Sequence, residues 1–210
     1  MDSFLQRLEK QSKTKKPVVM AFGRMNPPTT GHEKLVNKVH QLAKDYGADH
    51  RVIISHSMDT KKNPLDPQTK LKHAKRFFPN TNIEAASKDA PTFLQHAAKL
   101  HQQGYDHLIM VAGSDRVPEY EQKLKQYNGT AKGSLFNFKK IEVKSAGQRD
   151  PDAEGTEGMS ASKMREHAKS NNFNEFKQGV PSHVPEKHVR DLFRDVRKGM
   201  GLNEQVNRGL

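Results

Sequence analysis

The sequence predicts an α/β protein in which a doubly wound parallel sheet of about five strands is followed by C-terminal helices. Continuous apolar runs such as Val18–Phe22 and His107–Ala112 are typical of strands that are buried on both faces of a parallel sheet. Segments with helical spacing alternate with such runs four times along the chain. This alternation is the pattern of right-handed βαβ units.

The elements follow one another in a regular order. After the first strand, Leu35, Val36, Val39 and Leu42 recur at helical spacing, and Gly47 stands where that helix would end. The expected strands span residues 18–22, 51–56, 82–86, 107–112 and 135–143. The expected helices span residues 31–46, 66–78, 91–103, 161–169, 174–178 and 185–198.

The ends of the chain differ from its middle. Residues 2–12 read as a short amphipathic helix, so residues 1–16 are expected to form an N-terminal helical arm. The main α/β domain spans residues 17–170, and residues 171–210 form C-terminal helices and a tail. The last helix, with Leu192 and Phe193 on its apolar face, packs either on this core or on a second subunit, which leaves the oligomeric state open.

Composition restricts the class of protein. A formal net charge of +12 indicates an affinity for polyanions, although most lysines are spread along the chain as on a solvated face. The absence of cysteine excludes disulfides, thiolate zinc fingers and thiol nucleophiles. No stretch approaches the roughly 20 apolar residues of a membrane span. A cytoplasmic protein without a membrane partner is therefore expected.

The segment between the first strand and its helix is the first candidate site. It reads Gly23-Arg24-Met25-Asn26-Pro27-Pro28-Thr29-Thr30-Gly31-His32-Glu33 and falls at the carboxyl edge, where open α/β sheets bind ligands. Thr30 and Glu33 have capping-box spacing, which predicts a helix that begins at Gly31. The free amides of that helix end, the missing Cβ of Gly31 and the side chains of His32 and Arg24 would suit a phosphate.

A second candidate segment lies late in the chain. It reads Met159-Ser160-Ala161-Ser162-Lys163-Met164-Arg165, and Ser160 is a favourable N-cap for a helix. Arg165 is expected to project near that helix end, where a guanidinium can hold phosphate in a bidentate manner. Hydroxyls, amides and cations therefore meet at a second helix beginning.

The two segments resemble the signatures of a nucleotidyltransferase superfamily, which are [HT]-x-G-H and I-S-x-[ST]-x-x-R. Here they read Thr29-Thr30-Gly31-His32 and Met159 to Arg165, with methionine in place of isoleucine. Gly23 to Pro27 looks most like the nicotinamide-mononucleotide branch. Together with Lys61–Leu65 and Arg149–Gly155, the strings are similar to adenylyl- or cytidylyltransferase-like proteins of tailed bacteriophages. The resemblance covers roughly residues 17–180 and implies a Rossmann-like fold.

The resemblance implies a set of site residues. The expected catalytic residues are His32, Arg24, Lys62 and Arg165. The residues expected to contact the nucleotide are Gly23, Met25, Thr29, Gly31, Gly113, Asp115, Ser160 and Ser162. Ser55, Ser57 and Lys61 face phosphate or acceptor, or belong to a solvated loop. The acidic loop Gln148–Gly155 either shapes a magnesium or acceptor site or is a polar lid.

The implied activity is transfer of a nucleoside monophosphate from a nucleoside triphosphate, with ATP first, to a phosphorylated acceptor such as nicotinamide mononucleotide. Mg²⁺ accompanies the triphosphate, no protein metal ligand is assigned, and a phage-encoded protein would act in the host cytoplasm. One alternative is a CTP-dependent cytidylyltransferase. The other is a catalytically silent, basic phage protein bound to nucleic acid or the virion, which is less favoured because no nucleic-acid-binding signature occurs. P-loop and H-E-x-x-H strings are absent as well.

Overall fold

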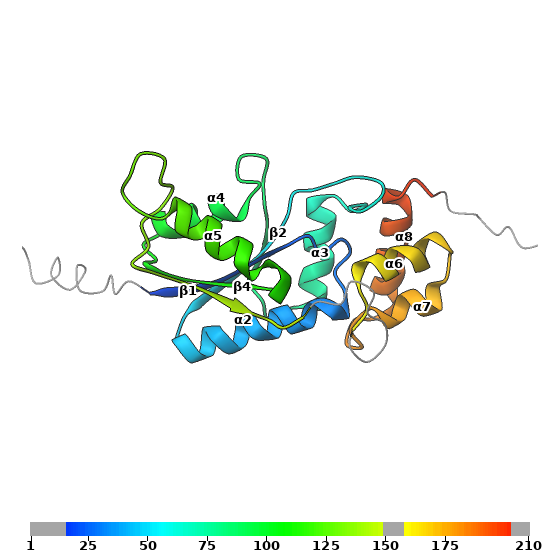
Figure 1. Ribbon diagram of the computed structural model, residues 1–210. Coiled ribbons are helices and arrows are strands. Elements are labelled where there is room, and N and C mark those ends of the chain that lie inside the picture. Colours follow the sequence, from blue (N-terminus) through cyan, green and yellow to red (C-terminus); the bar gives the residue numbers. More distant parts are fainter. Residues whose placement is uncertain (1–15, 149–157, 203–210) are drawn as a thin grey trace, which may run out of the picture.

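The computed structural model describes residues 16–148 and 158–202. Five parallel strands form one sheet in the order β3-β2-β1-β4-β5 (Figure 1), so the predicted doubly wound α/β fold is confirmed. The strands are β1 (Pro17–Gly23), β2 (Asp49–Ile54), β3 (Ile83–Ala85), β4 (His107–Ala112) and β5 (Lys140–Ser145). The α-helices are α2 (Glu33–Tyr46), α3 (Pro67–Phe77), α4 (Phe93–Gln102), α5 (Val117–Tyr127), α6 (Ala161–Lys169), α7 (Phe173–Gln178) and α8 (Glu186–Gly199).

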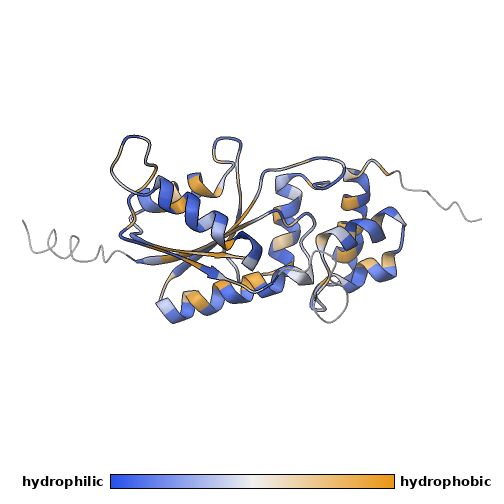
Figure 2. Ribbon diagram, in the orientation of Figure 1, coloured by the Kyte–Doolittle hydropathy of each residue, from blue (hydrophilic) through white to orange (hydrophobic). Residues whose placement is uncertain are grey.

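The central strand β1 is apolar throughout because both of its faces are covered. Val19 and Ala21 belong to one hydrophobic cluster, which also contains residues of α2 and α3. Val18 and Met20 belong to a second cluster on the opposite face, with residues of α4 and α5. Successive side chains of a strand point to opposite faces of a sheet. Figure 2 shows the resulting pattern of apolar strands and amphipathic helices.

The C-terminal helices share the first cluster. Met164 of α6, Phe176 of α7 and Leu192 of α8 are fully buried in the same cluster as Val19. These helices gather beside α3 at one end of the molecule (Figure 1). Helix α6, whose first turns carry the second candidate segment, is thus held in this cluster through Met164 and Ala168.

The expected strand 135–143 is wrong at its beginning, since β5 starts at Lys140. Phe136 and Phe138 are buried against the second cluster but lie in a loop. The Asn128 side chain accepts from the Phe138 amide at 2.8 Å and donates to its carbonyl at 3.1 Å. The apolar alternation here reflects burial against the second cluster, and the pairing of Phe136 is limited to one isolated parallel bridge with Asn128.

Helix α5 was missed by the sequence analysis, although its Tyr120 and Leu124 are buried. The strand expected at 51–56 begins earlier, at Asp49, and its pairing with β1 ends at Ile54. The other helices follow the expected order, with Asp66 and Ser160 as N-caps of α3 and α6. The N-terminal arm, residues Arg149–Gly155 of the acidic loop and the final tail lie outside the described residues. No helix within the described ranges has the length and apolar character to cross a membrane.

Candidate active site

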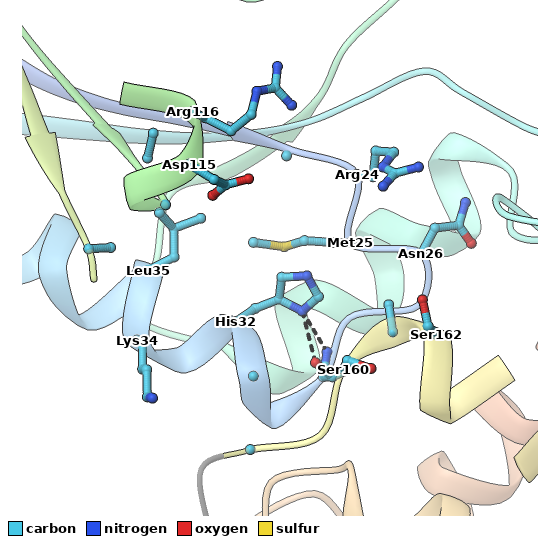
Figure 3. Close-up of a pocket in the computed structure, with 18 of the residues that line it drawn as sticks. Arg24, Met25, Asn26, His32, Lys34, Leu35, Asp115, Arg116, Ser160 and Ser162 are labelled. Atoms are coloured by element: carbon cyan, nitrogen blue, oxygen red, sulfur yellow. Dashed lines mark hydrogen bonds between the residues drawn. The ribbon is translucent and has the colours of Figure 1, made fainter. Parts of the chain in front are cut away.

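One cavity of about 300 Å³ opens at the carboxyl ends of β1, β4 and β5 (Figure 3). Every residue of the expected catalytic and nucleotide-contacting sets lines it. These residues are Gly23, Arg24, Met25, Thr29, Gly31, His32, Lys62, Gly113, Asp115, Ser160, Ser162 and Arg165. Asp115 lies on one side of the cavity and Arg24 on the other, with Met25 and His32 between them.

His32 has a defined orientation. Its Nδ1 atom accepts a hydrogen bond from the backbone amide of Thr29 at 3.0 Å, and the Thr29 hydroxyl lies 3.1 Å from the same nitrogen. Because an amide can only donate, Nδ1 carries a lone pair and the proton of the neutral ring is on Nε2. Thr29 is fully buried, so the imidazole is held as a donor toward the cavity.

The predicted capping arrangement of this turn is wrong. Thr30–His32 form a single 3-10 turn and α2 begins at Glu33, whereas a helix from Gly31 capped by Thr30 was expected. Thr29 takes the N-cap position and pairs with His32. The Thr30 hydroxyl instead accepts from the backbone amide of Met159 at 3.0 Å. The capping pair is thus Thr29 and His32, each one residue earlier than the expected pair Thr30 and Glu33.

The first turn and the second candidate segment are in direct backbone contact. The Gly31 amide donates to the Met159 carbonyl at 3.3 Å, and the Thr30 amide donates to the Gly179 carbonyl at 2.9 Å. A Cβ on Gly31 would lie 2.7 Å from the Met159 oxygen, and one on Gly158 would lie 2.8 Å from the Gly31 nitrogen. The space left by the missing Cβ of Gly31 was expected to admit a phosphate, but the Met159 carbonyl occupies it and also accepts from the Gly31 amide. The two glycines therefore allow the two backbones to meet.

Arg165 joins the two segments through its side chain. Its Nη1 atom donates to the Asn26 carbonyl at 2.8 Å, and Nη2 donates to the Ser162 hydroxyl at 3.1 Å. Burial, with the neighbouring charge of Arg24, lowers the pKa of Arg165 from its usual value. An anion in the cavity would relieve this repulsion between two guanidinium groups.

Asn26 lines the cavity but was not among the expected site residues. Its buried side chain donates to the Leu65 carbonyl at 3.0 Å and accepts from the Leu65 amide at 2.9 Å. The loop after β1 is thereby fixed to the loop after β2. The local sequence carries no sign of this partner 39 positions away.

The loop after β2 brings Lys62 to the cavity. Asp59 accepts from the amides of Lys61 at 2.9 Å and Lys62 at 2.6 Å, and from that of Asn63 at 3.3 Å. These bonds, that from Lys62 foremost, hold the pKa of Asp59 well below its usual range. Ser55, Ser57 and Lys61 do not line the cavity, although Lys62 does.

The opposite wall follows β4. Arg116 donates to Glu119 at 2.7 Å, and its guanidinium lies 5.2 Å from the centre of the Tyr120 ring. Further lining residues that were not expected are Phe22, Asn26, Lys34, Leu35, Arg116 and Tyr120. Aromatic, acidic and cationic side chains therefore meet on this side of the cavity.

The donor set does not form a metal cage. Within the described parts of the chain, no group of three or more histidine or acidic side chains could hold a metal ion. The one carboxylate among the described lining residues is that of Asp115. Mg²⁺ usually binds through one or two carboxylates together with substrate phosphates and water. The residues present fit a Mg²⁺ ion that arrives on a polyphosphate.

Solved structures of other proteins share this fold. A protein from Vibrio parahaemolyticus assigned as a nicotinate-nucleotide adenylyltransferase matches with a TM-score of 0.51 and 13% identity, over 85% of this chain and 99% of that one. Thermotoga maritima TmcAL bound with α-thio ATP matches with a TM-score of 0.50 and 10% identity, over 88% of this chain and 57% of that one. Its apo form matches equally, with the same identity. No protein-family model and no curated protein matches the sequence.

Proposed function

We propose that this cavity binds a nucleoside triphosphate and transfers its nucleoside monophosphate to a phosphate-bearing acceptor, with release of pyrophosphate. The observation that carries the proposal is the presence of His32 and Arg165 in one cavity. They come from two segments that are distant in sequence and that bond to each other through Thr30 and Met159. Adenylyltransferase assignment of a protein with the same fold supports this class of reaction.

The charge of the cavity suits a polyphosphate. Its lining carries the cationic side chains of Arg24, Lys34, Lys62, Arg116 and Arg165, against the carboxylate of Asp115. Arg24 and Lys62 are exposed, whereas Arg165 is half-buried and already fixed by two hydrogen bonds. A preorganised cation is worth more than a mobile one, because it does not reorganise during the reaction.

In the proposed reaction, an oxygen of the acceptor phosphate attacks the α-phosphorus in line. A new phosphorus–oxygen bond forms while the bond from the α-phosphorus to the bridging oxygen breaks, and the electron pair leaves with pyrophosphate. The neutral imidazole of His32 donates from Nε2 to an oxygen on which negative charge grows, and it transfers no proton. Arg24, Lys62 and Arg165 neutralise the remaining oxygens, so no covalent intermediate on the protein is needed.

Mg²⁺ would be held by the triphosphate oxygens, with Asp115 as the protein carboxylate able to join them. When bound, the ion supplies further neutralisation of phosphate charge. This role requires no dedicated set of protein ligands.

ATP and nicotinamide mononucleotide are the first substrate pair in this proposal. The Gly23 to Pro27 segment lies at the cavity, and a structural neighbour is assigned to a related mononucleotide acceptor. An ATP analogue is bound in another neighbour. A CTP-dependent transfer to an alcohol phosphate is the alternative within the same class.

The decisive experiment measures pyrophosphate release from ATP and CTP with a panel of acceptors that includes nicotinamide and nicotinate mononucleotides and glycerol phosphate. The purified His32→Ala protein sets the background for every pair. Release above that background with one pair establishes the transfer and identifies the substrates. Triphosphate binding by a folded protein without any release would instead indicate a binding module, and the proposed reaction would be wrong.

A further inference from the structure

Lys70 is a buried cation that lies outside the cavity lining. It is on α3, its exposed fraction is 0%, and the chain places it at a core-facing position with His73, Ala74 and Phe77. Lysine is almost never buried without a strong reason, because its charge must leave water. The position therefore calls for a role that an apolar side chain would not fill.

The hydrogen bonds of Lys70 converge on two site loops. Its Nζ atom donates to the Ser55 carbonyl at 2.6 Å and to the Arg24 carbonyl at 3.1 Å. The Ser57 carbonyl at 3.4 Å and the Ser55 hydroxyl at 3.5 Å complete the shell. All of these partners are neutral oxygens. The three N–H groups of the ammonium therefore link the chain segment that follows β1 to the segment that follows β2.

The two tied segments carry cations of the cavity. Arg24 itself lines the cavity, and the segment from Ser55 to Ser57 leads into the Asp59 turn that presents Lys62. We propose that Lys70 is a positioning residue of the triphosphate site, whose ammonium fixes the spacing of the Arg24 and Ser55–Ser57 segments and thereby the places of Arg24 and Lys62. This inference rests on the proposed function, since it assigns a role in polyphosphate binding.

The protonation of Lys70 is then coupled to ligand binding. Burial, followed by the charge of Arg24, lowers the pKa of Lys70 to about 8, while Asp66 at the start of α3 opposes the shift. Arg24 is in turn faced by Arg165 of α6. An anion beside Arg24 cancels part of its repulsion and favours the charged lysine, so binding near pH 8 takes up a proton.

The test is calorimetric titration of the full chain with ATP and with inorganic pyrophosphate at pH 7, 8 and 9, at a fixed Mg²⁺ concentration. Buffers of different ionisation enthalpy report the protons that are taken up. The wild type is expected to bind roughly five- to tenfold more weakly at pH 9 than at pH 7, and to take up roughly half a proton at pH 8. Lys70→Met should bind roughly ten- to a hundredfold more weakly at pH 7, without this pH dependence.

Two further variants separate positioning from simple stability. Lys70→Arg keeps a charge at every pH used and should restore affinity up to pH 9. Lys72→Met is the matched control, because Lys72 is on the same helix, is 49% exposed and contacts Asp195 at 3.3 Å, so it should bind as the wild type does. If Lys70→Met proves too unstable to purify, the role of Lys70 is tested by the other two proteins. Proton uptake at pH 8 by the wild type, and its absence in Lys70→Arg, would support that role.

Binding that is independent of pH in the wild type, without proton uptake at pH 8, would overturn the role of Lys70. So would equal affinities of folded Lys70→Met and Lys72→Met. The transferase proposal fails separately: tight, pH-dependent binding without pyrophosphate release would remove the reaction and keep the positioning role. A wild type that binds neither ATP nor pyrophosphate removes both.

Discussion

Arg165 donates a hydrogen bond of 2.8 Å to the backbone carbonyl of Asn26, 139 positions earlier in the chain. The same Asn26 binds both backbone groups of Leu65 through its side chain. Helix α6, the loop after β1 and the loop after β2 are thereby connected through one residue. These three segments, which all contribute to the cavity lining, are thus joined by hydrogen bonds to a single residue.

Replacement of Arg165 by lysine should expose this connection. A lysine cannot hold the Asn26 carbonyl and the Ser162 hydroxyl together with a planar fork. We expect the KM for the triphosphate to rise roughly tenfold or more, with a smaller change in kcat, because a hydrogen bond to a charged group contributes about 1.5–3 kcal/mol. Steady-state kinetics measure both constants. Arg194→Lys, at an exposed ion pair with Asp191, is the control, and equal KM values in the two variants would contradict the role of Arg165.

Replacement of His32 by alanine should lower turnover about a hundred- to a thousandfold, the usual loss for one transition-state donor. The KM should change much less, since the growing charge exists only in the transition state. The matched control is His40→Ala on α2, the helix that follows His32, where the ring contacts the Thr81 hydroxyl at 3.0 Å. Initial rates of pyrophosphate release give the comparison. Undiminished turnover in folded His32→Ala protein removes this residue from the mechanism.

Gly31→Ala should disturb the contact between the two site segments. The added Cβ would lie 2.7 Å from the Met159 carbonyl oxygen, so the backbones must separate. Overpacking of this kind costs about 1–3 kcal/mol in the free energy of unfolding, and turnover should fall with it. Denaturant unfolding measures the loss. Gly23→Ala, where nothing lies within 4 Å of the new Cβ, should change stability by less than about 0.5 kcal/mol. Equal stabilities of the two variants would show that the contact is dispensable.

Stability should fall in mild acid because of His73. Its Nε2 atom pairs with Asp195 at 2.8 Å, while its buried Nδ1 has no hydrogen-bond partner among the described residues. Burial lowers the pKa of His73 from 6.5, against the effect of Asp195. The unfolded chain therefore binds the proton first as the pH drops below about 6.5, and folding stability decreases until the folded pKa is passed.

Thermal unfolding at pH 7.5 and 5.5 tests this dependence. The difference in Tm between the two pH values should be smaller in His73→Gln than in the wild type, since glutamine does not titrate. His101→Gln, at the surface of α4, should retain the difference seen in the wild type. A His73→Gln protein with the full wild-type difference would assign the acid sensitivity to other groups.

Central strands were predictable because their surroundings are uniform. Both faces of β1 and β4 are covered, so Val18–Ala21 and Leu108–Val111 are apolar without interruption. β5 lies at the sheet edge and is only half-buried, and its sequence lacks that signal. The buried pair Phe136 and Phe138 carries the alternation instead, and it misplaced the start of this strand.

Many of the residues that line the cavity were predictable from two local strings, because each string combines a turn with polar side chains. Their joint geometry was not, since it depends on contacts between distant segments. The spacing between Thr30 and Glu33 predicted that Thr30 is an N-cap, yet its hydroxyl accepts a hydrogen bond from the Met159 amide. Lys70 left a trace in the sequence, as a lysine within the stripe formed by His73, Ala74 and Phe77. Such a charge at an otherwise apolar helical position is a usable signal.

The amide of Thr30 finds its acceptor at Gly179, and that of Gly31 finds its acceptor at Met159. Buried backbone donors need partners, and synthesis supplies these two only when most of the chain has been made. A nascent chain that already contains the whole sheet therefore still has an unfinished first turn. Under the proposed function, a chain that ends before Gly179 should therefore lack a complete polyphosphate site.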